Sequence, residues 1–432
     1  MKRLHPAKIL LLGYLLYSII GCMILSLPIC HREPIDFLDN YFTAISAVST
    51  TGLSTIDIGT KYNFFGQFII LSLIQFGGIG YMTFSSFILL CTAQKLSAYR
   101  KKIGTSTFSL PTHFSIQEFI FSVIVFSFIC EFLGAIALSI IFWHHNVDQF
   151  LWAGIFHSVS AFCTAGFSIF SDGLTAFQTD IECNLVLCLL TIFGSLGFIV
   201  SLDFYKKWIG EKKILSFTTK IILIITLAFL SMGTVVFFFL ETLSDHSSTL
   251  QKWMIGLFQV TSATTTTGFN STDIGTLSTP MLILLMFLST FGSAPSGTGG
   301  GLKNTTFATV VSFVKNTLRG QPTEIWHRTI SANRVKIATV AFIYYVFSLS
   351  FVLFLLTISE KQLFLTLFFE AANALNNSGL SMGLTSELTD LGKTFISLLM
   401  LMGRVGVLTF GVAISSQKET KELSRKTAEL IT

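Results

Sequence analysis

Hydrophobic positions along the chain gather in long runs, which short polar segments separate. The pattern predicts an all-α integral membrane protein with eight full spans, because each run is about the 17–25 residues that a helix needs to cross the hydrocarbon core, or longer. The runs occupy residues 9–27, 64–91, 119–143, 185–204, 221–240, 281–314, 337–358 and 395–414.

One short element occurs four times, once between the two spans of each successive pair. Each copy has a Phe ten residues before a Gly, a small polar residue six before it and an Ala five before it. Four copies at intervals of about a quarter of the chain predict four quasi-equivalent units around a common axis. The four glycines are Gly52, Gly166, Gly268 and Gly379, and the predicted modules are 1–104, 105–213, 214–330 and 331–432.

Each copy begins with about ten helix-compatible residues, such as 38–48. At about 1.5 Å per residue, such a helix reaches only half-way through the bilayer. Each module therefore reads as span, half-helix, extended loop and span. Non-helical backbone at this depth is tolerated only where protein buries it or water lines it, so the common axis is a candidate pore.

Composition supports a membrane protein: hydrophobic residues make up 51% of the chain and charged residues 12%, against about 25% charged in soluble domains. The side that carries the half-helices is mainly acidic. Basic clusters lie on the opposite side, at 2–3, 100–102, 206–207, 212–213, 328–336 and 418–426. The positive-inside rule places these clusters and both termini in the cytoplasm. The net charge of +5 is then a signal of topology and not of nucleic-acid binding.

The four loops have the residues that a ring of backbone carbonyls would need. Carbonyl oxygens can replace the water around a potassium ion, and Gly allows backbone conformations that side chains disfavour. A lone Thr-Gly after a helix is usually an ordinary turn, but four copies in register favour a filter. Its predicted ion-binding residues are Thr50, Thr51, Gly52, Thr164, Ala165, Gly166, Thr266, Thr267, Gly268, Asn377, Ser378 and Gly379.

Several motifs, in order, resemble those of the Trk/Ktr/HKT superfamily of potassium transporters, and most of all the bacterial Ktr-type membrane subunit. They lie at 46–53, 75–80, 160–168, 265–269, 292–295, 300–303 and 403–406. The resemblance implies four membrane-pore-membrane repeats around a pseudo-fourfold axis in a bacterial-type plasma (inner) membrane. It also implies a homodimer on a cytosolic ring of nucleotide-binding (RCK/KTN-type) regulatory subunits.

The presence of Gly at all four filter positions resembles the pattern in family members that favour potassium. The fourth copy departs from the family pattern, because Asn373, Asn376 and Asn377 replace the more usual Ser and Thr. A sodium-permeable or sodium-coupled transporter of the same fold therefore remains an alternative. No covalent cofactor is expected, and K+ is the transported ion, with Na+ as a candidate coupling or modulating ion.

The second span of the third module is interrupted by a Gly-rich segment, 292–303, which holds five Gly and a Pro between 292 and 301. Such a composition cannot remain a regular helix. The resemblance implies a gate loop that blocks the pore beneath the filter, and the alternative is a simple kink. The predicted gate residues are Gly297, Gly299, Gly300, Gly301, Lys303 and Arg404.

Two ionisable residues lie deep in spans, where charge is costly and usually faces protein or water. Arg404 matches the family arginine below the filter. Glu131 is expected to hold helices together through a hydrogen-bonded pair. An integral membrane enzyme is the distant alternative. It would need a catalytic set such as His-Glu-x-x-His or a Gly-x-Ser-x-Gly elbow, and we expect neither.

Overall fold

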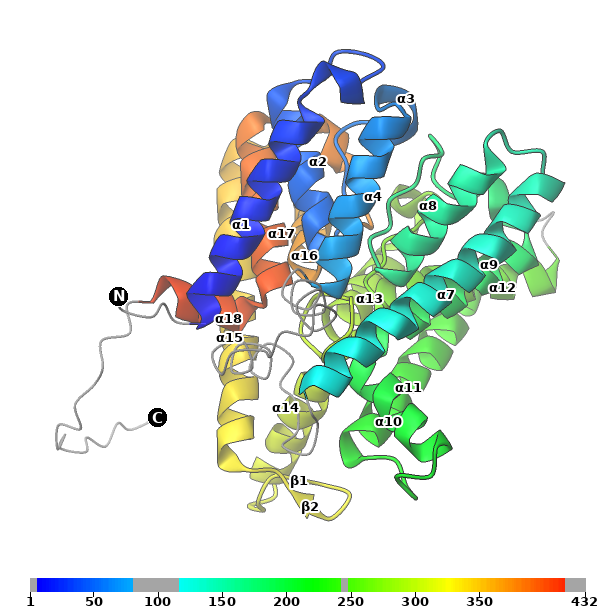
Figure 1. Ribbon diagram of the computed structural model, residues 1–432. Coiled ribbons are helices and arrows are strands. Elements are labelled where there is room, and N and C mark those ends of the chain that lie inside the picture. The colour runs from blue at the N-terminus through cyan, green and yellow to red at the C-terminus, as the bar shows by residue number, and fades with distance from the viewer. Residues whose placement is uncertain (1–5, 81–115, 242–247, 416–432) are drawn as a thin grey trace.

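The computed structural model describes residues 6–80, 116–241 and 248–415. Their secondary-structure elements are helices, apart from one short hairpin (Figure 1). The α-helices are α1 (Pro6–Leu25), α2 (Phe37–Ser49), α3 (Ile58–Lys61), α4 (Phe64–Ile79), α7 (Ile116–His144), α8 (Phe150–Phe162), α9 (Ile181–Ser195), α10 (Phe198–Trp208), α11 (Phe217–Leu240), α12 (Thr249–Thr264), α13 (Thr279–Phe291), α14 (Asn304–Thr317), α15 (Ala332–Ser359), α16 (Phe364–Asn376), α17 (Asp390–Val405) and α18 (Val407–Ile414).

The remaining elements are short. Strands β1 (Glu324–Ile325) and β2 (Arg328–Thr329) form an antiparallel hairpin in which Glu324 pairs with Thr329 and Ile325 with Arg328. Four 3₁₀ turns lie at η1 (Pro28–Cys30), η2 (Thr175–Phe177), η3 (Ile274–Thr276) and η4 (Leu384–Glu387).

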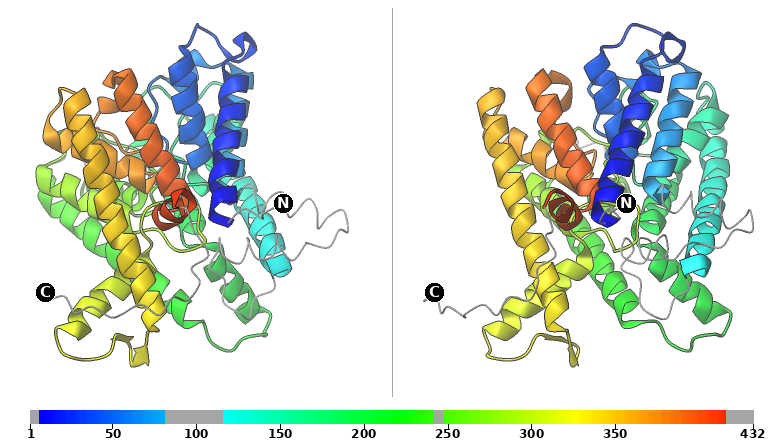
Figure 2. Two further views of the ribbon diagram at one scale, coloured as in Figure 1. Left: turned by 90° about the vertical axis from the view of Figure 1, so that its left-hand side faces the viewer. Right: turned by 60° about the vertical axis from the view of Figure 1, so that its left-hand side comes forward.

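Among the residues that the structure describes, four helices are long and apolar enough to cross a membrane without a break. They are α1, α7, α11 and α15, and in two views they stand around the molecule with shorter helices between them (Figure 2). Their outward side chains are large and apolar: Phe132 and Phe239 are 67% and 77% exposed. Exposed apolar surface on this scale suits contact with lipid.

The four half-helices, α2, α8, α12 and α16, lie where the repeated element predicts them. Each follows one long helix and is followed by a shorter apolar one. The Phe that begins each repeated element is a core residue, since Phe42, Phe156, Phe258 and Phe369 are all buried. These rings fix the half-helices against their neighbours, which explains why the sequence repeats a Phe at this position.

The helix after each half-helix contacts it through a glycine. At four equivalent positions, a Cβ atom would collide with the backbone carbonyl of the residue four before the filter glycine. In each module, the two backbones therefore approach closely at a matched point. The helix after the half-helix packs against it in the same way in all four modules. The pairs are Gly77 with Val48, Gly194 with Phe162, Gly292 with Thr264 and Gly403 with Leu375.

Gly77→Ala is expected to destabilise the protein by about 1–3 kcal/mol, the usual range for overpacking. Ala is otherwise the better helix former, so a loss of stability would report the collision with Val48. The measurement is thermal unfolding in detergent. Gly275→Ala is the control, because a Cβ there would meet no atom closer than 3.3 Å. Equal unfolding temperatures for both variants would contradict the close contact.

The structure does not confirm the eight full spans that the sequence predicts. In the second and fourth modules, the helix that follows the half-helix is sharply bent. Helices α9 and α10 meet at 93°, and α17 and α18 meet at 102°. Each break has a glycine with positive φ, 88° at Gly197 and 89° at Gly406, and α4 ends at Gly80 with φ 88°. A right-handed helix cannot continue through that conformation. The third module breaks between α13 and α14, as its Gly-rich segment predicts.

Candidate functional site

All four half-helices end in the same backbone motif. The N–H of Thr50 donates to the Ala47 carbonyl (3.1 Å), and the N–H of Thr51 donates to the Ser46 carbonyl (2.9 Å). This is a Schellman ending, which requires a left-handed residue, and Thr50 has φ 52°. The same pair of bonds recurs in the other modules, where Thr164, Thr266 and Asn377 have φ 51°, 57° and 52°.

The small polar residue of the repeated element holds the loop in two modules. The Ser160 hydroxyl donates to the Phe167 carbonyl at 2.8 Å, and the Ser262 hydroxyl donates to the Phe269 carbonyl at 2.6 Å. Each bond ties the half-helix to the residue directly after the filter glycine. Asn373 instead donates to the Phe369 carbonyl of its own helix, at 3.0 Å.

The four glycines lie next to one another in a closed cycle. A Cβ on Gly52 would collide with the Ala165 carbonyl, and one on Gly166 would collide with the Thr267 carbonyl. Continuing the cycle, a Cβ on Gly268 would meet the backbone of Gly379, and one on Gly379 would approach the Thr51 carbonyl and Gly52. The structure therefore brings the four loops together around one point, with backbone oxygens directly beside the glycines.

The polar side chains of the loops are buried and bond to one another. The hydroxyls of Ser49 and Thr51 lie 2.6 Å apart, and those of Thr265 and Thr267 lie 2.8 Å apart. Asn377 donates to the Thr51 hydroxyl at 2.9 Å and to the Met400 carbonyl at 2.7 Å, which joins the fourth loop to the first. Asn is one of the few residue types that tolerate positive φ, which gives a structural reason for Asn at position 377.

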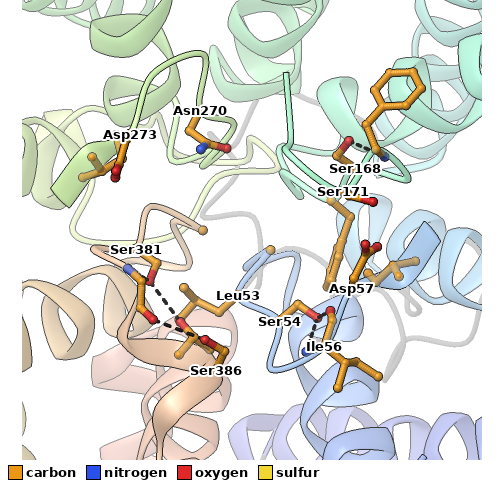
Figure 3. A pocket seen from close by; sticks show the side chains of 18 residues that line it. Leu53, Ser54, Ile56, Asp57, Ser168, Ser171, Asn270, Asp273, Ser381 and Ser386 are labelled. Atoms are coloured by element: carbon orange, nitrogen blue, oxygen red, sulfur yellow. Dashed lines mark hydrogen bonds between the residues drawn. The ribbon is translucent and has the colours of Figure 1, made fainter. Parts of the chain in front are cut away.

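A cavity of about 370 Å³ opens above the glycines, and side chains from all four loops surround it (Figure 3). Two carboxylates at its rim are fixed by backbone donors. Asp57 Oδ1 accepts from the Gly59 N–H at 2.8 Å, and Asp273 Oδ1 accepts from the Gly275 N–H at 2.9 Å. Held acidic groups at a polar mouth favour cations over anions, with an effect that salt screens.

A side chain nine residues before the filter glycine supports the rim in the second and fourth modules. His157 Nε2 lies 2.9 Å from the Ser168 hydroxyl, and Glu370 Oε1 accepts from the Ser381 hydroxyl at 2.9 Å. Both contacts join a buried half-helix side chain to a rim serine.

One sequence expectation is wrong. Residues 379–383 read Gly-Leu-Ser-Met-Gly, so the Gly-x-Ser-x-Gly letters are present. A hydrolase elbow places its Ser between a strand and a helix, whereas Ser381 follows helix α16 and its hydroxyl bonds to Glu370. The letters arise from the filter glycine and a turn at Gly383 and do not form a nucleophile elbow.

The segment between α13 and α14 lies beneath the ends of the half-helices. The Thr298 hydroxyl donates to the Phe162 carbonyl at 3.2 Å and accepts from the Thr164 hydroxyl at 3.0 Å. The Gly300 N–H donates to the Thr266 hydroxyl at 2.9 Å. A Cβ on Gly300 would also collide with the Asn376 carbonyl. The segment therefore contacts α8, α12 and α16 where each of them ends.

Arg404 links this segment to the first module. Its Nη1 donates to the Thr50 hydroxyl at 2.9 Å and to the Thr298 carbonyl. Its Nη2 donates to the carbonyls of Gly77 and, at 2.9 Å, Gly78. The guanidinium thus donates to three backbone carbonyls and one hydroxyl. The positive charge of Arg404 lies directly below the loops.

Lys303 is the second cation of this region. Its Nζ donates to the Gly299 carbonyl at 2.6 Å and to the Gly300 carbonyl at 3.2 Å. Within the described ranges, no ion pair gives Lys303 or Arg404 a carboxylate. Two basic side chains therefore lie below the filter glycines, and their hydrogen bonds go to backbone and hydroxyl oxygens.

Glu131 forms the hydrogen-bonded pair that its burial predicts. Gln75 Nε2 donates to both carboxylate oxygens, at 3.0 and 2.8 Å, which ties α7 to α4. The Cys163 thiol lies 3.7 Å from Glu131 Oε1. Since Cys163 directly precedes Thr164, the network supports the second loop from behind.

The sequence matches the TrkH family of cation transport proteins over residues 16–426, and the chain belongs to this family. It is 34% identical to "Ktr system potassium uptake protein B" of Bacillus subtilis, over 97% of this chain and 95% of that protein. It is 32% identical to "Potassium/sodium uptake protein NtpJ" of Enterococcus hirae, over 99% of this chain and 97% of that protein.

The fold agrees with this family. The crystal structure of the potassium transporter TrkH from Vibrio parahaemolyticus superimposes with a TM-score of 0.76, at 19% identity, over 96% of this chain and 86% of that one. The chain is thus a multi-pass membrane protein of a transporter family and not an enzyme.

Proposed function

We propose that this chain carries potassium ions into the cell through a filter built from its four Gly loops. The observation that supports this most is the closed cycle of Gly52, Gly166, Gly268 and Gly379, in which each glycine lies against the backbone of the next loop. Four matched elements of this kind support an arrangement of four membrane-pore-membrane repeats around a pseudo-fourfold axis. The potassium uptake proteins among its relatives point to the same ion.

In the proposed mechanism, backbone oxygens of residues 50–52, 164–166, 266–268 and 377–379 replace the water that a potassium ion sheds. The half-helices end at this point, and the partial negative charge of a helix C-terminus favours a cation. The membrane potential drives the ion inward. The Thr50, Thr164 and Thr266 hydroxyls bond to Arg404, Thr298 and Gly300 below the loops, which leaves the backbone as the proposed lining.

The gate in this proposal is the 292–303 segment, with Gly297, Gly299, Gly300, Gly301, Lys303 and Arg404. The contacts of Thr298 and Gly300 with the ends of α8, α12 and α16 support this role. The positive charge of Lys303 and Arg404 opposes cation leak in the closed state. Opening requires the segment to leave these contacts.

The proposal extends to assembly and location. By the positive-inside rule, the basic segments described above favour cytoplasmic termini, and we propose a bacterial-type plasma (inner) membrane. The relative of Bacillus subtilis is named as one protein of a Ktr system. We therefore expect a homodimer and a separate cytosolic nucleotide-binding ring as the regulatory partner.

A sodium-permeable or sodium-coupled transporter is the second candidate. Two observations favour it: the relative of Enterococcus hirae is named for both potassium and sodium, and Asn373 does not hold its loop as Ser160 and Ser262 do. Ion competition on uptake separates the two candidates.

Expression in cells stripped of their own potassium importers tests the proposed function. The chain, together with its regulatory partner, is expected to restore growth at limiting potassium and to take up tracer potassium at a rate that saturates. Cells with the empty vector provide the baseline. If inserted protein gives neither growth nor uptake above that baseline, potassium uptake is the wrong function.

A further inference from the structure

A cavity of about 360 Å³ lies between the turn that joins α10 to α11 and the β1–β2 hairpin. Figure 1 draws both at the end of the molecule opposite α3, far from the filter loops. The residues that matter for its chemistry are Lys212, Ser216, Phe217, Lys220, Trp326 and Arg328.

The cavity carries an excess of positive charge. Lys212 pairs with the buried carboxylate of Asp203 at 2.7 Å. Lys220 and Arg328 form no ion pair within the part of the chain that the structure describes. The Arg328 guanidinium instead lies 5.2 Å from the Phe217 ring centre, a cation–π contact that leaves its donors for a ligand.

Both walls of the cavity are held in place. Asp203 accepts from the Ser216 N–H at 2.7 Å as well as from Lys212, which fixes the turn before α11. On the other wall, the Ser312 hydroxyl donates to the Glu324 carbonyl at 2.6 Å, which fixes the hairpin to α14. The basic side chains are therefore presented on a preformed surface.

The hairpin tip has an unusual backbone. Trp326 and His327 have φ 49° and 59°, although a two-residue hairpin turn with positive φ at both positions usually holds Asn or Gly. The Trp326 ring lies 5.7 Å from the Phe217 ring, edge to face, and Trp326 is still 49% exposed. An aromatic side chain is thus kept beside the cations at a cost in backbone strain.

We propose that this cavity binds the headgroup phosphate of an anionic phospholipid. It lies at the start of the spanning helix α11 and just before α15, which is the level of the headgroups. Lys220 and Arg328 would contact the phosphate, and basic pockets at this depth attract anionic lipid. Trp326 and Ile214, which is 70% exposed, would contact the apolar part of the lipid, as interfacial aromatic residues do.

The proposal rests on the membrane location of the chain and not on the filter, so its test uses lipid binding. The purified full-length protein in detergent is titrated with phosphatidylglycerol, phosphatidylcholine or inorganic phosphate, and bound lipid is counted by native mass spectrometry. Lys220→Gln with Arg328→Gln is expected to weaken phosphatidylglycerol binding about tenfold or more, since basic residues near the membrane surface attract anionic lipid.

The matched control is Lys207→Gln with Lys213→Gln, which removes two charges from the end of α10 and the following turn, at residues that do not line the cavity. It is expected to retain phosphatidylglycerol binding within about twofold, and both double variants should keep the parental unfolding temperature in phosphatidylcholine. Equal loss in both double variants would overturn the proposed site. Binding of inorganic phosphate as tight as that of phosphatidylglycerol would also overturn it, because the apolar wall would then contribute nothing.

Discussion

Gly52→Ser is expected to lower the preference for potassium over sodium by about tenfold or more, which corresponds to about 1.4 kcal/mol between the two ions. A Cβ at this position collides with the Ala165 carbonyl of the neighbouring loop. That carbonyl must move, and the oxygens around the ion then lose their spacing. Gly52 also has φ 90°, which a side chain disfavours.

The matched control is Gly210→Ser. Gly210 has a similar φ of 81°, but no atom lies within 4 Å of a Cβ there, so the change reproduces the backbone strain without the collision. Initial uptake of potassium with sodium as competitor is the measurement. Unchanged selectivity in all four single Gly→Ser variants of the filter glycines would refute the filter.

Deleting residues 297–301, or changing Arg404→Ala, is expected to raise potassium flux in the absence of the regulatory ring by about tenfold or more. Arg404 donates to the Thr298 carbonyl and to Thr50, Gly77 and Gly78, and hydrogen bonds to charged groups contribute about 1.5–3 kcal/mol each. Their loss shifts the population towards the open state. Selectivity should change little, because the glycine cycle is untouched.

Flux into proteoliposomes, normalised to inserted protein, measures this effect. Arg319→Ala is the control, because it removes an exposed arginine just after α14, away from the segment. If the deletion protein is well folded and conducts no faster than the parent, the segment is a structural kink and not a gate.

The sequence predicts the shared local structure of the four Gly loops, because its signal is repeated. Phe, Ala and Gly recur at fixed spacing, and the structure gives each a local reason: a core ring, a helix end and a close approach of backbones. A second repeated glycine, at 77, 194, 292 and 403, is also present in the sequence. The sequence alone does not mark it as a contact, because single glycines inside apolar runs are common and Arg404 stands where Gly78, Ser195 and Ser293 stand in the other copies.

The sequence also does not predict the bends at Gly197 and Gly406, because single glycines are common in apolar runs. A continuous apolar run predicts length but not whether one glycine adopts positive φ, which depends on tertiary contacts. Hydrophobic periodicity also does not predict which side chains far apart in the sequence become hydrogen-bond partners. Gln75 with Glu131 and Asn377 with Thr51 meet only because helices and loops far apart in the chain pack together.

The reversal potential of proteoliposomes with potassium on one side and sodium on the other tests the central claim most directly. The parental protein, opened by deletion of residues 297–301, is expected to give a potential near that of a potassium-selective membrane, and Gly52→Ser in the same background should move it towards zero. A potential that is the same with and without Gly52→Ser would show that the four loops do not select the ion.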